Sequence, residues 1–469
     1  MAIARNASLA VLVAGLGCGH PHAPPAATPA AATAVPVQYR TLPNGLRVVL
    51  SPDTSAPVVT VAVYYHIGFR IEPRDRTGFA HLFEHLMFQG SRNLGKMQFI
   101  KLIQSNGGVL NGSTRFDFTN YFEIVPANTL QTILWAEADR MRGLAITQDN
   151  LTNQQGVVKS EVRVNVLNRP YGGFPWLQMP QYANTNWYNA HNFYGDLHDI
   201  DAATLGDAQA FFHTYYSPGN AVLVVTGAID PAQASAWIDQ YFGPIPSAPL
   251  PSRPDVSEPP QQKEIRASLD DTLAARPALA IAYHMPPRNT PEFYAMGLID
   301  QIVLQGHDSR LYDALVQRAG VTGDVDGGIN LLGNMFDYEG PMLWTAYLYH
   351  DTQVSPDRIL AAIDSAIAPL LAAPVDAATL SRALVKERAD LYATIGGSQL
   401  PGFGRADLLA SFALFDNDPG RINAIDAAFQ AVTPELIQRT AQRYLAPSNR
   451  TVLILNAKAR SAQHAPVGQ

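Results

Sequence analysis

Residues 80–90, AHLFEHLMFQG, recur without a gap as residues 296–306, MGLIDQIVLQG. Both stretches keep apolar side chains at matching positions, and both end on Gln-Gly. Two further pairs of segments repeat in the same order, at separations of 218 and 229 residues: 63–66 with 281–284, and 215–225 with 444–455. An internal repeat at this spacing predicts two copies of one domain, each about 220 residues long.

Length and composition agree with this interpretation. The chain has 469 residues, which is too long for one ordinary domain. Its 47% hydrophobic and 16% charged residues exclude disordered and collagen-like proteins. The formal net charge of −7 argues against nucleic acid as a partner, because phosphate binding requires a basic surface. The single cysteine, Cys18, excludes an internal disulfide and a cysteine-based metal site.

Each copy has the pattern of an α+β domain. Residues 47–50 and 58–65 are rich in β-branched side chains and predict strands. Helical periodicity predicts three helices, over residues 77–89, 130–143 and 151–166. This order predicts two homologous α/β-sandwich domains, each with helices on one face of a mostly antiparallel sheet.

Seven prolines between residues 244 and 260 mark the boundary between the copies, because a proline-rich stretch forms an extended, semi-rigid linker. We therefore expect four parts: an export signal and tether over 1–37, an N-terminal domain over 38–243, a linker over 244–265 and a C-terminal domain over 266–460.

The first 18 residues have the pattern of an export signal. Arg5 supplies a positive charge, and residues 9–16 form an apolar run that is too short to span a membrane. Cys18 follows directly, as in a bacterial lipoprotein signal, and residues 19–37 form an Ala/Pro-rich tether. We expect export to the periplasm, with either a lipid anchor on Cys18 or simple cleavage of the signal.

Three polar residues of the first copy share one face of a predicted helix. At about 100° per residue, His81, Glu84 and His85 lie within roughly 100° of one another, and apolar residues occupy the opposite face. Two histidines four positions apart can bind one metal ion, and zinc suits imidazole ligands. The second copy has Gly297, Asp300 and Gln301 in their places, so the fold alone does not require His, Glu and His at these positions.

A catalytic zinc ion needs a third protein ligand and an open position for water. The best candidate is Glu161, on a second predicted helix 76 residues beyond His85. Spacing alone leaves Glu123 and Glu137 open as alternatives.

Several short motifs accompany the His-x-x-Glu-His pattern: LPNGL at 42–46, GFA at 78–80, VKSE at 158–161 and NRPYG at 168–172. In this combination the chain resembles the M16 (pitrilysin/insulysin-like) metallopeptidases, which carry this inverted zinc motif. The resemblance covers residues 38–458, and the length points to the bacterial half-size branch related to mitochondrial processing peptidase.

The resemblance implies a zinc-dependent endopeptidase that hydrolyses peptides or unfolded segments between two clam-like halves. It implies one zinc ion per chain, bound by His81, His85 and Glu161, with Glu84 as the general base. An acidic helper residue is common seven positions before the third ligand. That position holds Gln154 in this chain, which changes the hydrogen bonding expected around the metal ligands.

The resemblance also implies a substrate-binding strand. Residues 107–114 resemble the family's edge strand, to which a peptide adds as a further strand through backbone hydrogen bonds. The substrate-binding residues are then Leu110, Asn111, Gly112 and Ser113. A simple turn at Asn111-Gly112 is the alternative.

One departure from the family pattern predicts a partner. The family uses an Arg and a Tyr from the second domain, but the aligned positions hold Val316 and Gly323, and Arg318 lies two residues from the Arg position. We therefore expect a homologous partner subunit, without zinc, that supplies Arg and Tyr. The competing interpretations are a non-catalytic structural subunit, as in respiratory-complex core proteins, and a peptide-binding, chaperone-like subunit.

Overall fold

The computed structural model describes residues 34–397, 400 and 402–458, and from Val35 onward the chain forms one compact unit. The predicted export signal, Cys18 and tether residues 19–33 lie outside the described residues, as do residues 459 and 460 of the predicted C-terminal domain.

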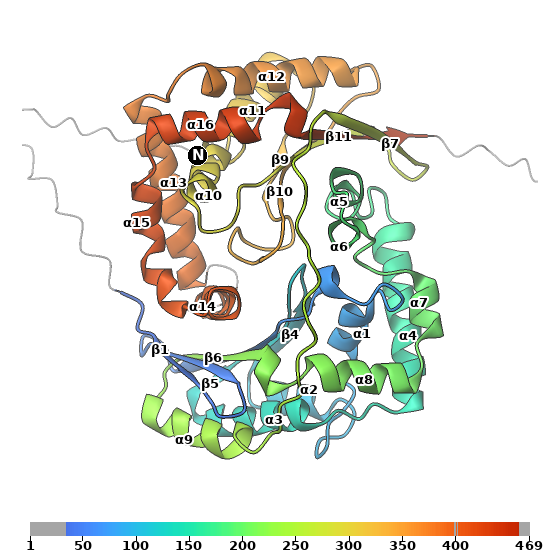
Figure 1. The fold of residues 1–469 in the computed structure, drawn as a ribbon, viewed down its shortest axis with the longest axis vertical. Coiled ribbons are helices and arrows are strands. Elements are labelled where there is room, and N and C mark those ends of the chain that lie inside the picture. Colours follow the sequence, from blue (N-terminus) through green and yellow to red (C-terminus); the bar gives the residue numbers. More distant parts are fainter. Residues whose placement is uncertain (1–33, 398–399, 401, 459–469) are drawn as a thin grey trace, which may run out of the picture. The chain divides into compact units, whose positions relative to one another are not determined.

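The first half of the chain forms a six-stranded sheet in the order β1-β2-β6-β3-β5-β4 (Figure 1). Its strands are β1 (Gln38–Thr41), β2 (Arg47–Pro52), β3 (Val58–Tyr65), β4 (Val109–Thr114), β5 (Thr119–Pro126) and β6 (Ala221–Gly227). All neighbours pair antiparallel except β2 and β6. The predicted strands at 47–50 and 58–65 are confirmed as β2 and β3.

The second half forms a five-stranded sheet in the order β7-β11-β8-β10-β9. Its strands are β7 (Ile265–Asp271), β8 (Ala278–His284), β9 (Asp326–Ile329), β10 (Leu343–Tyr349) and β11 (Arg450–Ala457). This order and the single parallel pair, β7 with β11, reproduce the arrangement β2-β6-β3-β5-β4 of the first sheet. The two-copy prediction and the mostly antiparallel sheet are therefore confirmed.

Helices surround both sheets. In the first half they are α1 (Phe79–Leu86), α2 (Gln98–Ser105), α3 (Leu130–Arg142), α4 (Gln148–Val162), α5 (Met179–Ala183), α6 (Trp187–Ala190), α7 (Leu197–Ala202), α8 (Leu205–Tyr215) and α9 (Pro231–Phe242). In the second half they are α10 (Pro291–Val303), α11 (Arg310–Tyr312), α12 (Pro356–Ala372), α13 (Ala377–Gly396), α14 (Phe403–Phe415), α15 (Ile425–Gln430) and α16 (Pro434–Tyr444). The three predicted helices correspond to α1, α3 and α4. Within the described residues no single helix has the length and apolar composition of a membrane span, and α12 with α13 meets that test only as a pair bent by 111°.

Each half of the chain also covers the sheet of the other half, which the sequence did not predict. The helices α1 and α3 cover one face of the first sheet, as expected, while α14 from the second half contacts β2, β3 and β6 on the other face (Figure 1). In return, α5 from the first half contacts β7, β8 and β11. Burial on both faces explains why β3, apart from Thr60, has no alternation of polar and apolar residues.

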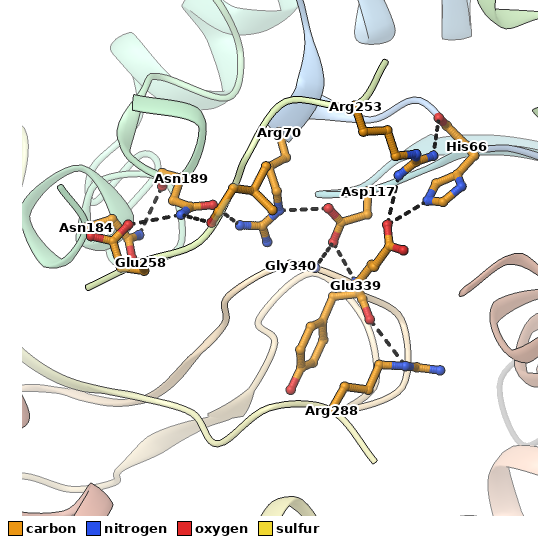
Figure 2. Close-up of polar contacts among 12 residues, drawn as sticks. His66, Arg70, Asp117, Asn184, Asn189, Arg253, Glu258, Arg288, Glu339 and Gly340 are labelled. Carbon is orange, nitrogen blue, oxygen red and sulfur yellow. Dashed lines mark hydrogen bonds and ion pairs between the residues drawn. The ribbon is translucent and has the colours of Figure 1, made fainter. Parts of the chain in front are cut away.

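A buried ion pair reinforces the junction between the halves (Figure 2). Arg70 Nε lies 2.7 Å from Asp117 Oδ1, and both side chains are at least 96% buried. The other oxygen of Asp117 accepts the backbone N–H groups of Glu339 at 2.8 Å and Gly340 at 3.3 Å, which belong to the second half. The carboxylate thus has protein partners on both oxygens, as a buried charge requires.

The chain between α9 and β7 has neither helix nor strand and is tied to the first half (Figure 2). Asn189 donates to the carbonyl of Val256 at 2.8 Å and to Glu258 at 3.0 Å. Arg253 donates to Glu339 at 2.8 Å, so the same stretch also contacts the second half. The domain limits 38–243 and 266–460 stay a prediction.

Candidate metal centre

Helix α1 is fixed by its apolar face and by its first turn. Phe79 and Phe83 are at most 1% exposed and enter the core of the first half. The carboxylate of Glu72 accepts the backbone N–H groups of Gly78 at 2.8 Å and Ala80 at 2.5 Å, which have no partner inside the helix. Burial raises the pKa of Glu72 to about 8, against the opposing effect of these two donors.

The helices α1 and α4 bring three of the predicted side chains together. His81 Nε2 and His85 Nε2 lie 3.3 Å apart. Glu161 places one oxygen 3.2 Å from His85 Nε2 and the other 3.7 Å from His81 Nε2. A metal ion needs several His, Cys, Asp or Glu side chains close together. Among the described residues, one group of three or more has ligand atoms that all lie within 4.8 Å of one another, and it consists of His81, His85 and Glu161.

This group fits a zinc ion. Bonds of 2.0–2.1 Å to a tetrahedral ion place two ligand atoms roughly 3.3–3.4 Å apart, and the two imidazole nitrogens lie at 3.3 Å. The Glu161 carboxylate adds an oxygen within reach of each imidazole, at 3.2 Å and 3.7 Å. Burial, reinforced by the nearby His85, lowers the pKa of His81 to about 4. The hydrogen bond from His85 lowers the pKa of Glu161. Neutral imidazole and ionised carboxylate are the forms that bind metal.

Glu84 lies on the same helix and is held by the neighbouring strand β4. Its Oε2 accepts a hydrogen bond from the Thr114 hydroxyl at 2.7 Å. Burial raises the pKa of Glu84, and the hydrogen bond from Thr114 opposes this shift. A carboxylate with a raised pKa binds a proton more strongly, which suits a general base.

The strand β4 is the edge of the first sheet and passes close to Glu84. Among the described strands it pairs only with β5. The N–H of Arg115 donates to the Phe118 carbonyl, so the backbone groups of Arg115 point towards the chain of β5. In an antiparallel pair, successive residues point their N–H and C=O groups alternately towards and away from the partner strand. The backbone groups of Leu110 and Gly112 therefore point away from β5. A Cβ on Gly112 would lie 3.3 Å from Glu84 Cγ, so glycine allows this close approach.

The remaining predicted residues are placed as follows. Asn111 is exposed, and Ser113 donates to Asn120 at 2.5 Å. Gln154 is buried on α4 and donates to Asn153 at 2.7 Å. No hydrogen bond joins Gln154 to the three candidate ligands within the described part of the chain.

The structure separates the alternative carboxylates from the candidate ligands. Glu123 on β5 and Glu137 on α3 are fully buried beside Arg140, and neither joins the group with His81 and His85. Spacing could not distinguish them from Glu161, because all three lie on regular elements after the histidines.

Three residues near the site, Thr114, Glu72 and Tyr194, were not predicted from the sequence. Thr114 could have been found, because it follows Gly112 by two positions and so shares its face of the strand. Glu72 and Tyr194 carry no periodic signal, since both lie in irregular segments. The ring of Tyr194 lies 5.2 Å from that of His81.

Comparison with known proteins gives matches over most of the chain. The model of the family "Insulinase (Peptidase family M16)" matches residues 47–186, and the model "Peptidase M16 inactive domain" matches residues 202–385. Zinc protease PqqE of Helicobacter pylori is 29% identical over 285 residues, which are 59% of this chain and 63% of that protein. This chain therefore spans less than two thirds of that relative.

Two further comparisons extend this similarity. The beta subunit of the mitochondrial-processing peptidase of Neurospora crassa is 26% identical over 339 residues, or 69% of each chain. The crystal structure of a protease from Helicobacter pylori has a TM-score of 0.82 at 23% sequence identity, covering 90% of this chain and all of that one. The last comparison shows that the two chains share a fold.

We predict that protein stripped with a chelator binds one zinc ion per chain. Glu161→Gln should weaken zinc binding by more than about 100-fold, because a ligand oxygen is replaced and the charge is lost. Competition with a zinc-binding dye measures the affinity, and Glu435→Gln, at an exposed glutamate on α16, is the control. Equal affinities in the two variants would contradict the site.

Proposed function

Because the chain belongs to the M16 peptidase family, we propose that it is a zinc-dependent endopeptidase that cleaves peptides or unfolded segments. The observation that carries this proposal is the convergence of His81, His85 and Glu161 beside Glu84. Non-catalytic relatives need none of these groups, and all four occur together in the first half. The interpretation as a structural or peptide-binding subunit is therefore the weaker one.

The proposed chemistry assigns a separate role to each side chain. A zinc ion held by His81, His85 and Glu161 would lower the pKa of a bound water molecule and polarise the carbonyl of the scissile bond. Glu84 accepts the proton that the water loses, and then passes it to the nitrogen of the leaving amine. Thr114 holds one oxygen of Glu84 by a hydrogen bond, which leaves the other oxygen for this transfer.

The proposed substrate binds as an extended strand on β4. The free backbone groups of Leu110 and Gly112 can pair with a peptide, and the close approach of Gly112 to Glu84 brings the paired backbone next to the proposed base. Such pairing recognises conformation more than side chains, so we expect cleavage of many different sequences.

The proposal includes a homologous partner and export. A relative named as a beta subunit supports paired assembly. The position aligned with the family's arginine holds Val316, and the nearby Arg318 is exposed and paired with Asp313 at 2.8 Å, which does not suit a substrate-binding role in this chain. Export to the periplasm rests on the apolar run before Cys18.

We predict that Glu84→Gln lowers the turnover of a quenched fluorescent peptide by about 10³-fold, because the amide cannot accept the proton. Zinc content should stay at one ion per chain, since the three ligands are unchanged. Initial rates and metal analysis of the purified protein give both values, with Glu435→Gln as the control. A Glu84→Gln protein that still cleaves the peptide would rule out the assigned base.

We also predict that Gly112→Val lowers kcat/KM for the same peptide by about 100-fold. The added side chain would displace Glu84 and Tyr121, whose ring lies 3.2 Å from the position of the new Cβ, and small displacements of a base have effects of this size. Gly143→Val is the control, because a Cβ there meets no atom of the described residues within 4 Å. Similar rates for both variants would contradict a catalytic role for the close approach of β4 to Glu84.

A further inference from the structure

Tyr194 is a polar residue at the candidate site that the proposed mechanism leaves without a role. Its ring meets the imidazole of His81 edge to face, with centroids 5.2 Å apart. Trp176 packs against the same ring at 5.4 Å and Phe69 at 6.5 Å. These contacts hold the ring between His81, Trp176 and Phe69.

The backbone of Tyr194 is fixed against the start of α1. Its N–H donates to the side chain of Asn192 at 3.1 Å, and Asn192 also bonds to Gly195 through its side chain and its carbonyl. Gly195 has a φ of 79°, in the left-handed region that favours glycine. A Cβ on Gly78 would lie 2.9 Å from the Tyr194 carbonyl, so the turn and the helix are in direct contact.

The hydroxyl of Tyr194 is available to a ligand. The residue is half-buried, and within the described part of the chain its hydroxyl makes no hydrogen bond. An ordinary tyrosine phenol carries its proton at neutral pH, so this hydroxyl is a hydrogen-bond donor.

We propose that Tyr194 is a further catalytic residue, whose hydroxyl donates a hydrogen bond to the carbonyl oxygen of the scissile bond as that oxygen gains negative charge. A fixed donor aimed at developing charge is an effective form of catalysis, because it needs no reorganisation during the reaction. The phenol keeps its proton throughout, and the water proton still travels through Glu84 to the leaving nitrogen. This proposal rests on the peptidase function proposed above.

The proposal changes what a partner subunit must supply. The position aligned with the family's second-domain tyrosine holds Gly323, and a Cβ there would meet no described atom within 4 Å. Tyr194 provides a phenol from the first half of the same chain, and its ring contacts His81 on α1. A tyrosine from a second chain is then not required for turnover.

The test compares Tyr194→Phe with Tyr182→Phe, a control at an exposed tyrosine on α5. Phenylalanine keeps the ring that packs on His81 and removes only the hydroxyl. We expect kcat for the quenched peptide to fall about 100-fold in Tyr194→Phe, with KM within about threefold and one zinc ion per chain. The control should match the wild type in all three values.

A binding measurement separates this proposal from the proposed function. Calorimetry with a phosphinic peptide, which mimics the charged transition state, should show about 100-fold weaker binding to Tyr194→Phe than to the wild type. Binding of the ordinary peptide to Glu84→Gln should not change when Tyr194→Phe is added. Equal affinity of the wild type and Tyr194→Phe for the phosphinic peptide would overturn the role of Tyr194 and leave the peptidase function untouched. Loss of zinc together with activity in Tyr194→Phe would do the same. A wild type that, even when mixed with a homologous M16 subunit, neither cleaves peptide nor binds the phosphinic peptide would overturn the peptidase function as well.

Discussion

The packing of helix α1 against helix α4 is the contact on which the candidate site depends. Leu82 and Phe83 of α1 share a core cluster with Val158 and Val162 of α4, and each such buried side chain stabilises the fold by roughly 1.5–3 kcal/mol. This apolar contact holds two imidazoles and a carboxylate within reach of one another on the polar faces. The apolar contact also offsets the free-energy cost of partly removing these polar groups from water.

A second close approach joins the site to the sheet edge. The strand β4 can lie against α1 because Gly112 has no side chain, and Thr114 then reaches Glu84 from the next position on the same face. Along its outer edge, the same strand has backbone groups that pair with no other strand of the described chain. Three elements, α1, α4 and β4, thus position the proposed ligands, the proposed base and the proposed substrate strand.

Much of this arrangement could be predicted from the sequence, because it rests on local patterns and on the repeat. The repeated segments predicted two copies of one domain, and the helical spacing predicted that His81 and His85 point the same way. Periodicity shows which residues are buried but not what buries them, so the mutual covering of the sheets by α14 and α5 was missed. Tyr194 was missed for a related reason, since it reaches the site from an irregular turn.

The central claim is that His81, His85 and Glu161 form a zinc site in this protein. Diffraction from crystals of the zinc-loaded protein, measured at the zinc absorption edge, tests it most directly. The account predicts one anomalous peak at about 2.0–2.2 Å from both Nε2 atoms and from an oxygen of Glu161. A peak bound to other residues, or no peak among these three side chains, would contradict it.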